Sequence, residues 1–131
     1  MLGKTLVIGV GSMGGALLRG ALHNGILQKQ DTSVLVRRSE QLQSLQEELG
    51  ISGFTDMPDL TSFSTIILAV KPQVLPFVLS QMGSVTEGTT VISVAAGITL
   101  ATLQSALPNA IMYRAMPNTP ASIGCGMTAL T

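Results

Sequence analysis

Short apolar runs alternate along the chain with longer segments in which apolar residues recur every three or four positions. The short runs predict β-strands, because four to six apolar residues bounded by turn residues suit a strand buried in a sheet. The run at 65–70 is rich in β-branched residues and lacks polar alternation, as in a parallel strand covered on both faces. The predicted strands are 6–8, 33–36, 53–55, 65–70, 90–94 and 110–115.

The longer segments predict helices at 12–24, 39–49, 74–82 and 99–107. In the second of these, Leu42, Leu45 and Leu49 fall on one helical face and Gly50 follows as the stop. Thr99 is a suitable N-cap for the last helix. Strands that alternate with helices form right-handed βαβ units, so we expect a doubly wound α/β fold: a mainly parallel sheet with helices on both faces.

Composition narrows the class of protein further. The 131 residues are enough for one domain, 46% of them are apolar and only 11% are charged, which excludes a disordered chain. Seven basic residues balance seven acidic ones, so no positive excess favours nucleic acid as a partner. We find no basic leader and no run of about 20 apolar residues, and we therefore expect a cytoplasmic protein without a membrane partner.

A glycine-rich turn lies between the first predicted strand and the first predicted helix. Gly9, Gly11 and Gly14 form the pattern GxGxxG there, followed by Ser12 and Met13 at the start of the helix. In a Rossmann-like dinucleotide-binding fold the first glycine permits a tight turn, the second lets the backbone approach a diphosphate, and the third permits close helix packing. The alternative is that these glycines only permit close packing.

The end of the second predicted strand indicates which nucleotide would bind. An acidic residue there contacts the ribose 2′-hydroxyl of NAD, whereas arginine accommodates the 2′-phosphate of NADP. This chain has Arg37, Arg38 and Ser39, which favours NADP(H) because guanidinium groups form charge-assisted bonds to phosphate oxygens. The alternative is a solvated pair of arginines before a helix.

Other predicted strand ends are expected to lie at the same crevice, since ligands of open α/β sheets bind outside the carboxyl ends of the strands. Lys71 offers a cation for cofactor oxygens, or is simply a solvated lysine. Asn118 offers a hydrogen bond to a nicotinamide or a substrate, or to its own turn. The candidate residues at these ends are Ala69, Val70, Lys71, Ala95, Ala96, Gly97 and Asn118.

Catalytic and metal chemistry find little support in the sequence. His23 is the only histidine and Cys125 the only cysteine, and no cluster of histidine, cysteine or carboxylate has the spacing of a metal site. We therefore predict no metal site and assign no catalytic side chain.

Four motifs together resemble pyrroline-5-carboxylate reductase: IGVGSMG at 8–14, LAVKPQ at 68–73, VISVAAGI at 91–98 and RAMPNTPA at 114–121. The resemblance covers nearly the whole chain and implies NADPH-dependent reduction of 1-pyrroline-5-carboxylate to L-proline, in proline biosynthesis. It implies cofactor contacts from Ser12, Met13, Arg38, Ala69, Lys71, Ala95 and Ala96, with Asn118 near the nicotinamide.

Members of that family are about twice as long, and their C-terminal half is a helical domain that forms the dimer and holds the substrate. We therefore expect residues 1–131 to be an isolated NADP-binding domain that binds NADPH, turns over the imine poorly, and self-associates as a homo-oligomer through uncovered apolar surface. Two alternatives remain: another NADP-linked oxidoreductase of the β-hydroxyacid dehydrogenase or deazaflavin-dependent type, and a nucleotide-binding module without catalysis.

Overall fold

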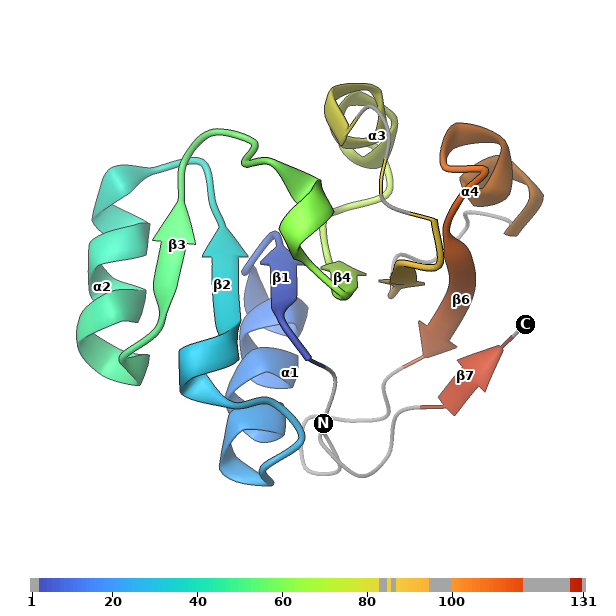
Figure 1. Ribbon diagram of the computed structural model, residues 1–131. Helices are drawn as coiled ribbons and strands as arrows, with labels where there is room; N and C mark the ends of the chain where they lie inside the picture. Colours follow the sequence, from blue (N-terminus) through green and yellow to red (C-terminus); the bar gives the residue numbers. More distant parts are fainter. Residues whose placement is uncertain (1–2, 83–84, 86, 95–99, 117–127, 131) are drawn as a thin grey trace.

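A single sheet organises the molecule (Figure 1). The computed structural model describes residues 3–82, 85, 87–94, 100–116 and 128–130. Within them the strands are β1 (Thr5–Ile8), β2 (Thr32–Leu35), β3 (Ser52–Phe54), β4 (Thr65–Leu68), β5 (Thr90–Ser93), β6 (Ile111–Met116) and β7 (Thr128–Leu130). The helices are α1 (Ser12–His23), α2 (Ser39–Leu49), α3 (Leu75–Met82) and α4 (Leu100–Ala106), with two 3₁₀ turns, η1 (Lys29–Asp31) and η2 (Leu60–Ser62).

The sheet has the order β3-β2-β1-β4-β5-β6-β7, and β1 to β6 pair in parallel. The chain leaves β1 toward β2 and β3, then crosses over to β4 on the other side of β1. The strand order therefore reverses between β2 and β4, and such a reversal opens a crevice at the carboxyl ends of the strands. This topology confirms the predicted doubly wound, mainly parallel fold.

Helices cover both faces of the sheet, as Figure 1 shows. Alternate residues of β1 contribute to the two cores: Leu6 and Ile8 pack with α3 and α4, whereas Val7 packs with α1 and α2. All three side chains are at most 2% exposed. Burial on both faces explains why the strands read as continuous apolar runs instead of alternating ones.

Some element boundaries differ from those predicted. The run at 65–70 leaves the sheet after Leu68, and Ala69 keeps one ladder bond by donating its N–H to the Ile8 carbonyl oxygen at 2.8 Å. Strand β3 begins one residue earlier than predicted. Strand β7, which pairs antiparallel with β6, was not predicted, because its three residues carry no apolar period that sets them apart. The N-cap prediction for Thr99 falls outside the described residues.

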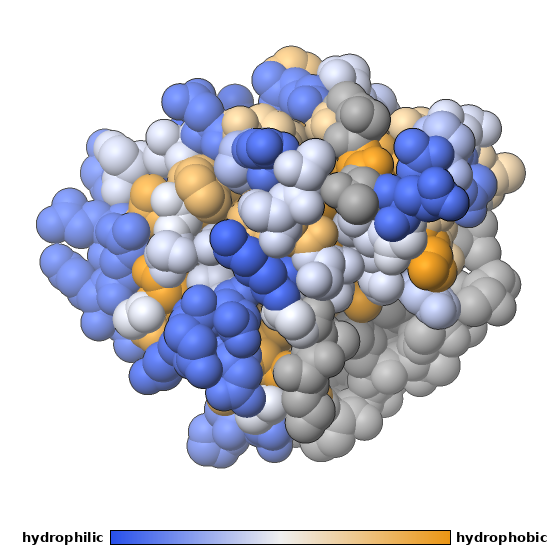
Figure 2. Space-filling model, in the orientation of Figure 1, coloured by the Kyte–Doolittle hydropathy of each residue, from blue (hydrophilic) through white to orange (hydrophobic). Residues whose placement is uncertain are grey.

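An ion pair joins α1 to α2 on the outer surface, where hydrophilic side chains dominate the edge formed by α2 (Figure 2). Arg19 donates from Nε and from one terminal nitrogen to the two Glu48 carboxylate oxygens, at 2.6 and 2.9 Å. The hydrogen bonds from Arg19 hold the pKa of Glu48 below its ordinary value of 4.5 and raise the pKa of Arg19. Since both side chains are about half exposed, we expect a small contribution to stability.

Changing Glu48 to Gln is expected to lower the melting temperature at neutral pH but not in acid. The folded-state pKa of Glu48 is depressed, so the pair stabilises the fold above pH 4.5 and loses that effect as the pH falls through the folded-state pKa. Thermal melts of both proteins between about pH 7 and 3 measure the difference. Glu47→Gln, one position away on the exposed surface, is the matched control, and an equal effect of both variants at all pH values would contradict the expectation.

Candidate functional site

The turn between β1 and α1 has the geometry that the glycine pattern predicts. Gly9 adopts φ +90°, a conformation that residues with a side chain rarely adopt. A Cβ atom placed on it would lie 2.6 Å from Val70 Cγ1 and 3.1 Å from the Ala69 backbone. Gly9 is therefore required both for its backbone conformation and for the close approach of the turn to the end of β4.

The other two glycines of the pattern are surrounded differently. A Cβ on Gly14 would lie 2.5 Å from the Gly9 carbonyl oxygen and 3.0 Å from Ala69 Cβ, so α1 packs directly on the turn and on the end of β4. A Cβ on Gly11 would meet no atom within 4 Å. The space beside Gly11 is open, and Gly11 is the N-cap of α1 without any side-chain cap hydrogen bond. The first N–H groups of α1 are thus available to an anion.

Hydrogen bonds join this turn to the ends of the neighbouring strands, including the bond from the Ala69 N–H after β4 to the Ile8 carbonyl oxygen. The Gly9 N–H donates to the Leu35 carbonyl oxygen at 3.0 Å, at the end of β2. One residue beyond, Val36 donates to the Phe54 carbonyl oxygen of β3 at 3.0 Å. The carboxyl ends of β1, β2, β3 and β4 are therefore held in register around the glycine turn.

A cleft of about 1010 Å³ lies at these carboxyl ends. It runs from the glycine turn past the end of β2 to one side of α3. The residues that line it are Ile8, Gly9, Val10, Gly11, Leu35, Val36, Arg37, Arg38, Gln41, Thr55, Asp56, Met57, Val70, Gln73, Val74, Phe77, Val78 and Gln81.

Two arginines give the cleft its charge. Arg37 and Arg38 follow β2 after one intervening residue, Val36. Both arginines are exposed, and Arg38 is the N-cap of α2 in extended conformation. Asp56 is the acidic residue that lines the same cleft. The lining is thus net positive beside a helix N-terminus, an arrangement that favours a ligand with several negative charges.

The structure unites some of the predicted site residues and leaves others apart. Gly9, Gly11, Arg37, Arg38 and Val70 line the cleft. Gly14 lies beneath the turn, and Ser12 and Met13 form the first turn of α1. Ser39, Ala69 and Lys71 do not line the cleft. Cofactor contacts by all of these residues stay predictions. Ala95, Ala96, Gly97 and Asn118 lie outside the described residues.

Sequence reasoning missed three contributors to the cleft. Gln41, in the first turn of α2, donates from Nε2 to the Val10 carbonyl oxygen at 2.7 Å. The loop 55–57 after β3 supplies a second wall. A third wall is formed by α3 and the residue before it, through Val74, Phe77, Val78 and Gln81. The spacing i, i+3, i+4, i+7 of these four residues was a readable signal. Phe77 is 63% exposed at this wall although it is a large apolar residue.

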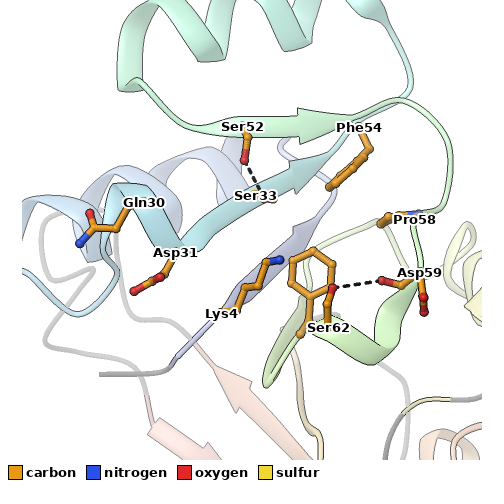
Figure 3. A pocket seen from close by; sticks show the side chains of 10 residues that line it. Lys4, Gln30, Asp31, Ser33, Ser52, Phe54, Pro58, Asp59 and Ser62 are labelled. Carbon is orange, nitrogen blue, oxygen red and sulfur yellow. Dashed lines mark hydrogen bonds between the residues drawn. The ribbon is translucent and has the colours of Figure 1, made fainter.

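A second cavity of about 440 Å³ lies at the opposite, amino ends of β1 and β2 (Figure 3). Some of its polar groups have partners within the cavity lining. The Ser33 and Ser52 hydroxyls lie 2.9 Å apart, and the Lys4 ammonium lies 5.3 Å from the centre of the Phe63 ring. Because ligands of this fold class bind at the carboxyl ends of the strands, the larger cleft is the candidate site.

Changing Gly11 to Asp is expected to preserve folding but to weaken nucleotide binding about ten-fold or more, which is about 1.4 kcal/mol. Aspartate is a favourable N-cap, so stability stays equal or rises by a few tenths of a kcal/mol. Its carboxylate would enter the open space beside Gly11 and repel a diphosphate. Thermal melts and a fluorescence titration with NADPH measure the two effects. Ser44→Asp adds the same charge on the exposed side of α2 and is the control; unchanged affinity in Gly11→Asp would refute the expectation.

Residues 4–97 match the family described as NADP oxidoreductase, coenzyme F420-dependent. The chain belongs to this family. Its fold is that of a pyridine-nucleotide-binding domain, with the strand-to-helix turn at the reversal of strand order.

Three curated relatives of the chain are pyrroline-5-carboxylate reductases. The chain is 36% identical to the pyrroline-5-carboxylate reductase of Thermus thermophilus over 124 residues, which are 95% of this chain and 46% of the relative. It is 35% identical to the Escherichia coli enzyme of the same name over 95% of this chain and 47% of the relative. It is 40% identical to that of Methanosarcina acetivorans over 88% and 44%. The chain thus spans about half the length of these relatives.

Solved structures agree with this relationship. The pyrroline-5-carboxylate reductase of Coxiella burnetii superposes with a TM-score of 0.73 at 26% identity, over 99% of this chain and 50% of the other. The enzyme from Streptococcus pyogenes superposes with a TM-score of 0.73 at 25% identity, over 98% of this chain and 49% of the other.

Among the residues described for the present chain, no helix is long and apolar enough to cross a membrane.

Proposed function

We propose that residues 1–131 form the NADP(H)-binding domain of a pyrroline-5-carboxylate reductase, which reduces 1-pyrroline-5-carboxylate to L-proline. One observation carries the proposal: the glycine turn and the Arg37–Arg38 pair line the same cleft at the switch point of a parallel sheet. The names of the relatives supply the reaction.

The choice of NADP(H) over NAD(H) rests on charge. The adenosine ribose of a nucleotide whose diphosphate lies at the N-terminus of α1 would extend toward the end of β2. There Arg37 and Arg38 would bind a 2′-phosphate through charge-assisted hydrogen bonds. Opposite them, the apolar wall of α3 around Val74 and Phe77 would cover the adenine ring.

The domain's contribution to the reaction is positioning. When bound, the reduced nicotinamide supplies the hydride for the C=N carbon of the substrate, and a proton completes the amine. The residues of this chain would bind the diphosphate, the ribose phosphate and the adenine, and so fix where the other end of the cofactor lies. We assign no general acid or base to the described residues.

The relatives' remaining length bears on the substrate. We propose that the small imine substrate and the homo-oligomer both require the part of the relatives that this chain does not match. The 131 residues alone are then expected to bind NADPH and to reduce the imine poorly, because an unheld substrate loses effective positioning. Self-association of the 131 residues stays a prediction that light scattering can measure.

A second candidate function follows from the family description, which names coenzyme F420. In that case the same cleft would hold NADP(H), and the hydride would be exchanged with a deazaflavin instead of an imine. The motif Met116-Pro117-Asn118-Thr119-Pro120, part of the resemblance to pyrroline-5-carboxylate reductase, favours the imine.

The test combines binding with turnover. The 131 residues are titrated with NADPH and NADH, and a fusion to the remaining part of the Thermus thermophilus relative is assayed for loss of NADPH absorbance with 1-pyrroline-5-carboxylate or with oxidised coenzyme F420. We expect tighter binding of NADPH and turnover of the imine by the fusion. Equal affinities would refute the NADP(H) assignment, and turnover of only the deazaflavin would establish the second function.

A further inference from the structure

Three peptide groups of the glycine turn are held by hydrogen bonds, and in two of them the partner is another backbone group. The Gly9 N–H is bonded to the Leu35 carbonyl oxygen, and the Gly11 carbonyl oxygen accepts from the Gly15 N–H at 2.7 Å, which begins α1. Between them, the Val10 carbonyl oxygen accepts from a side chain, Gln41 Nε2, at 2.7 Å. The Val10–Gly11 peptide of the turn is therefore held by a residue 31 positions away in the sequence.

The orientation of this peptide matters for anion binding. The structure contains no cis peptide bond between described residues, so the Val10–Gly11 peptide is trans, and its C=O and N–H groups point in opposite directions. Holding the Val10 carbonyl toward α2 directs the Gly11 N–H away from α2. Without this hydrogen bond the Val10–Gly11 peptide could rotate to the opposite orientation, because Gly11 has no side chain to oppose the rotation.

We propose that Gln41 is a positioning residue for the cofactor: its side-chain amide locks the Val10–Gly11 peptide so that the Gly11 N–H is presented to the diphosphate. Gln41 is half-buried and lines the cleft itself, and it lies three positions after Arg38 on the same helix. This inference rests on the proposed nucleotide-binding function and adds a residue that the glycine pattern does not contain.

The proposal makes a specific demand on the nucleotide. NADPH and NADH both carry the diphosphate, so Gln41→Met, which keeps the length of the side chain and removes the donor, is expected to weaken both about five-fold, as for the loss of one hydrogen bond. The ratio of the two affinities stays unchanged. Adenosine 2′-monophosphate has the 2′-phosphate but no diphosphate, and its affinity stays within about two-fold.

A measurement without nucleotide tests whether Gln41 holds the Val10–Gly11 peptide in one orientation. Backbone ¹⁵N relaxation dispersion reports exchange between orientations on the microsecond to millisecond timescale. We expect exchange at Gly11 in Gln41→Met and none in the unaltered chain. Gln43→Met is the matched control, since Gln43 lies on the same helix, is exposed and bonds only weakly to Glu47 at 3.4 Å.

The outcomes separate the inference from the proposed function. A loss confined to NADPH and adenosine 2′-monophosphate would overturn the inference, because Gln41 would then support the arginines instead of the turn. Unchanged affinities and an unchanged Gly11 signal would also overturn it. If the unaltered chain binds none of the three nucleotides, the proposed function fails, and the relaxation of Gly11 still decides whether Gln41 holds the peptide.

Discussion

Changing Arg37 and Arg38 together to Ala is expected to lower the affinity for NADPH roughly 100-fold and to leave that for NADH nearly unchanged. Each charge-assisted hydrogen bond to a phosphate contributes about 1.5–3 kcal/mol, and two at the lower end, appropriate for exposed side chains, give about 3 kcal/mol. The two guanidinium groups would contact only the 2′-phosphate, which NADH lacks. Parallel calorimetric titrations with the two nucleotides measure the change in preference.

The control for this variant carries the same loss of charge elsewhere. Arg19 and Lys29 are exposed and do not line the cleft, so the double change of both to Ala removes two positive charges without touching the proposed phosphate site. If the control lowers the affinity for NADPH as much, net charge and not local contact would be responsible. In the unaltered chain, the ratio of the affinities for NADPH and NADH is also expected to fall as the salt concentration rises, because exposed charges are screened.

Changing Gly9 to Ala is expected to destabilise the fold by about 3 kcal/mol, enough to remove much of the stability of a domain of this size. Two costs add. A residue with a side chain is strained at φ +90°, at about 1–3 kcal/mol, and its Cβ would crowd Val70 and the Ala69 backbone, at about another 1–3 kcal/mol. Urea denaturation followed by circular dichroism measures the free energy of unfolding.

Gly88 offers a control that separates the two costs. It has nearly the same backbone conformation, φ +87°, but a Cβ placed on it would meet no atom within 4 Å. Gly88→Ala is therefore expected to show the strain alone, and Gly9→Ala to be the more destabilising of the two. Equal losses would mean that the turn moves away from the end of β4 at little cost, against the tight packing described above.

Much of the fold could be predicted from local patterns. The helix 39–49 was predicted with both boundaries correct, because Leu42, Leu45 and Leu49 mark its buried face and Gly50 in left-handed conformation ends it. The strands β1 to β6 were located to within one or two residues, whereas β7 was missed. Boundary errors arose where the apolar run continues beyond the ladder, as at Ala69 and Val70, since a sequence does not show where the partner strand ends.

The candidate site could be predicted only in part. The GxGxxG pattern and the arginines can be recognised from their residue types and from their positions after predicted strands. In the structure, Gly9, Gly11 and the two arginines line one cleft. Gln41 could not be found in this way, because a glutamine in the first turn of a helix is common and its partner is a backbone carbonyl 31 positions away. The loop 55–57 carries no periodic sequence pattern that would mark it as part of the site. The wall formed by α3 did carry such a pattern, the spacing i, i+3, i+4, i+7.

The sequence by itself determined the alternation of six strands with four helices, a mainly parallel sheet with helices on both faces, and the position of the glycine turn. These features depend on residue type and spacing along the chain. Only the tertiary structure decided that α3 lines the same cleft as the arginines, that the space beside Gly11 is open and that a side chain of α2 holds the turn. Contacts of this kind depend on how segments that are distant in the sequence pack together. Local hydrophobic periodicity predicts helices and strands but not the distances between them.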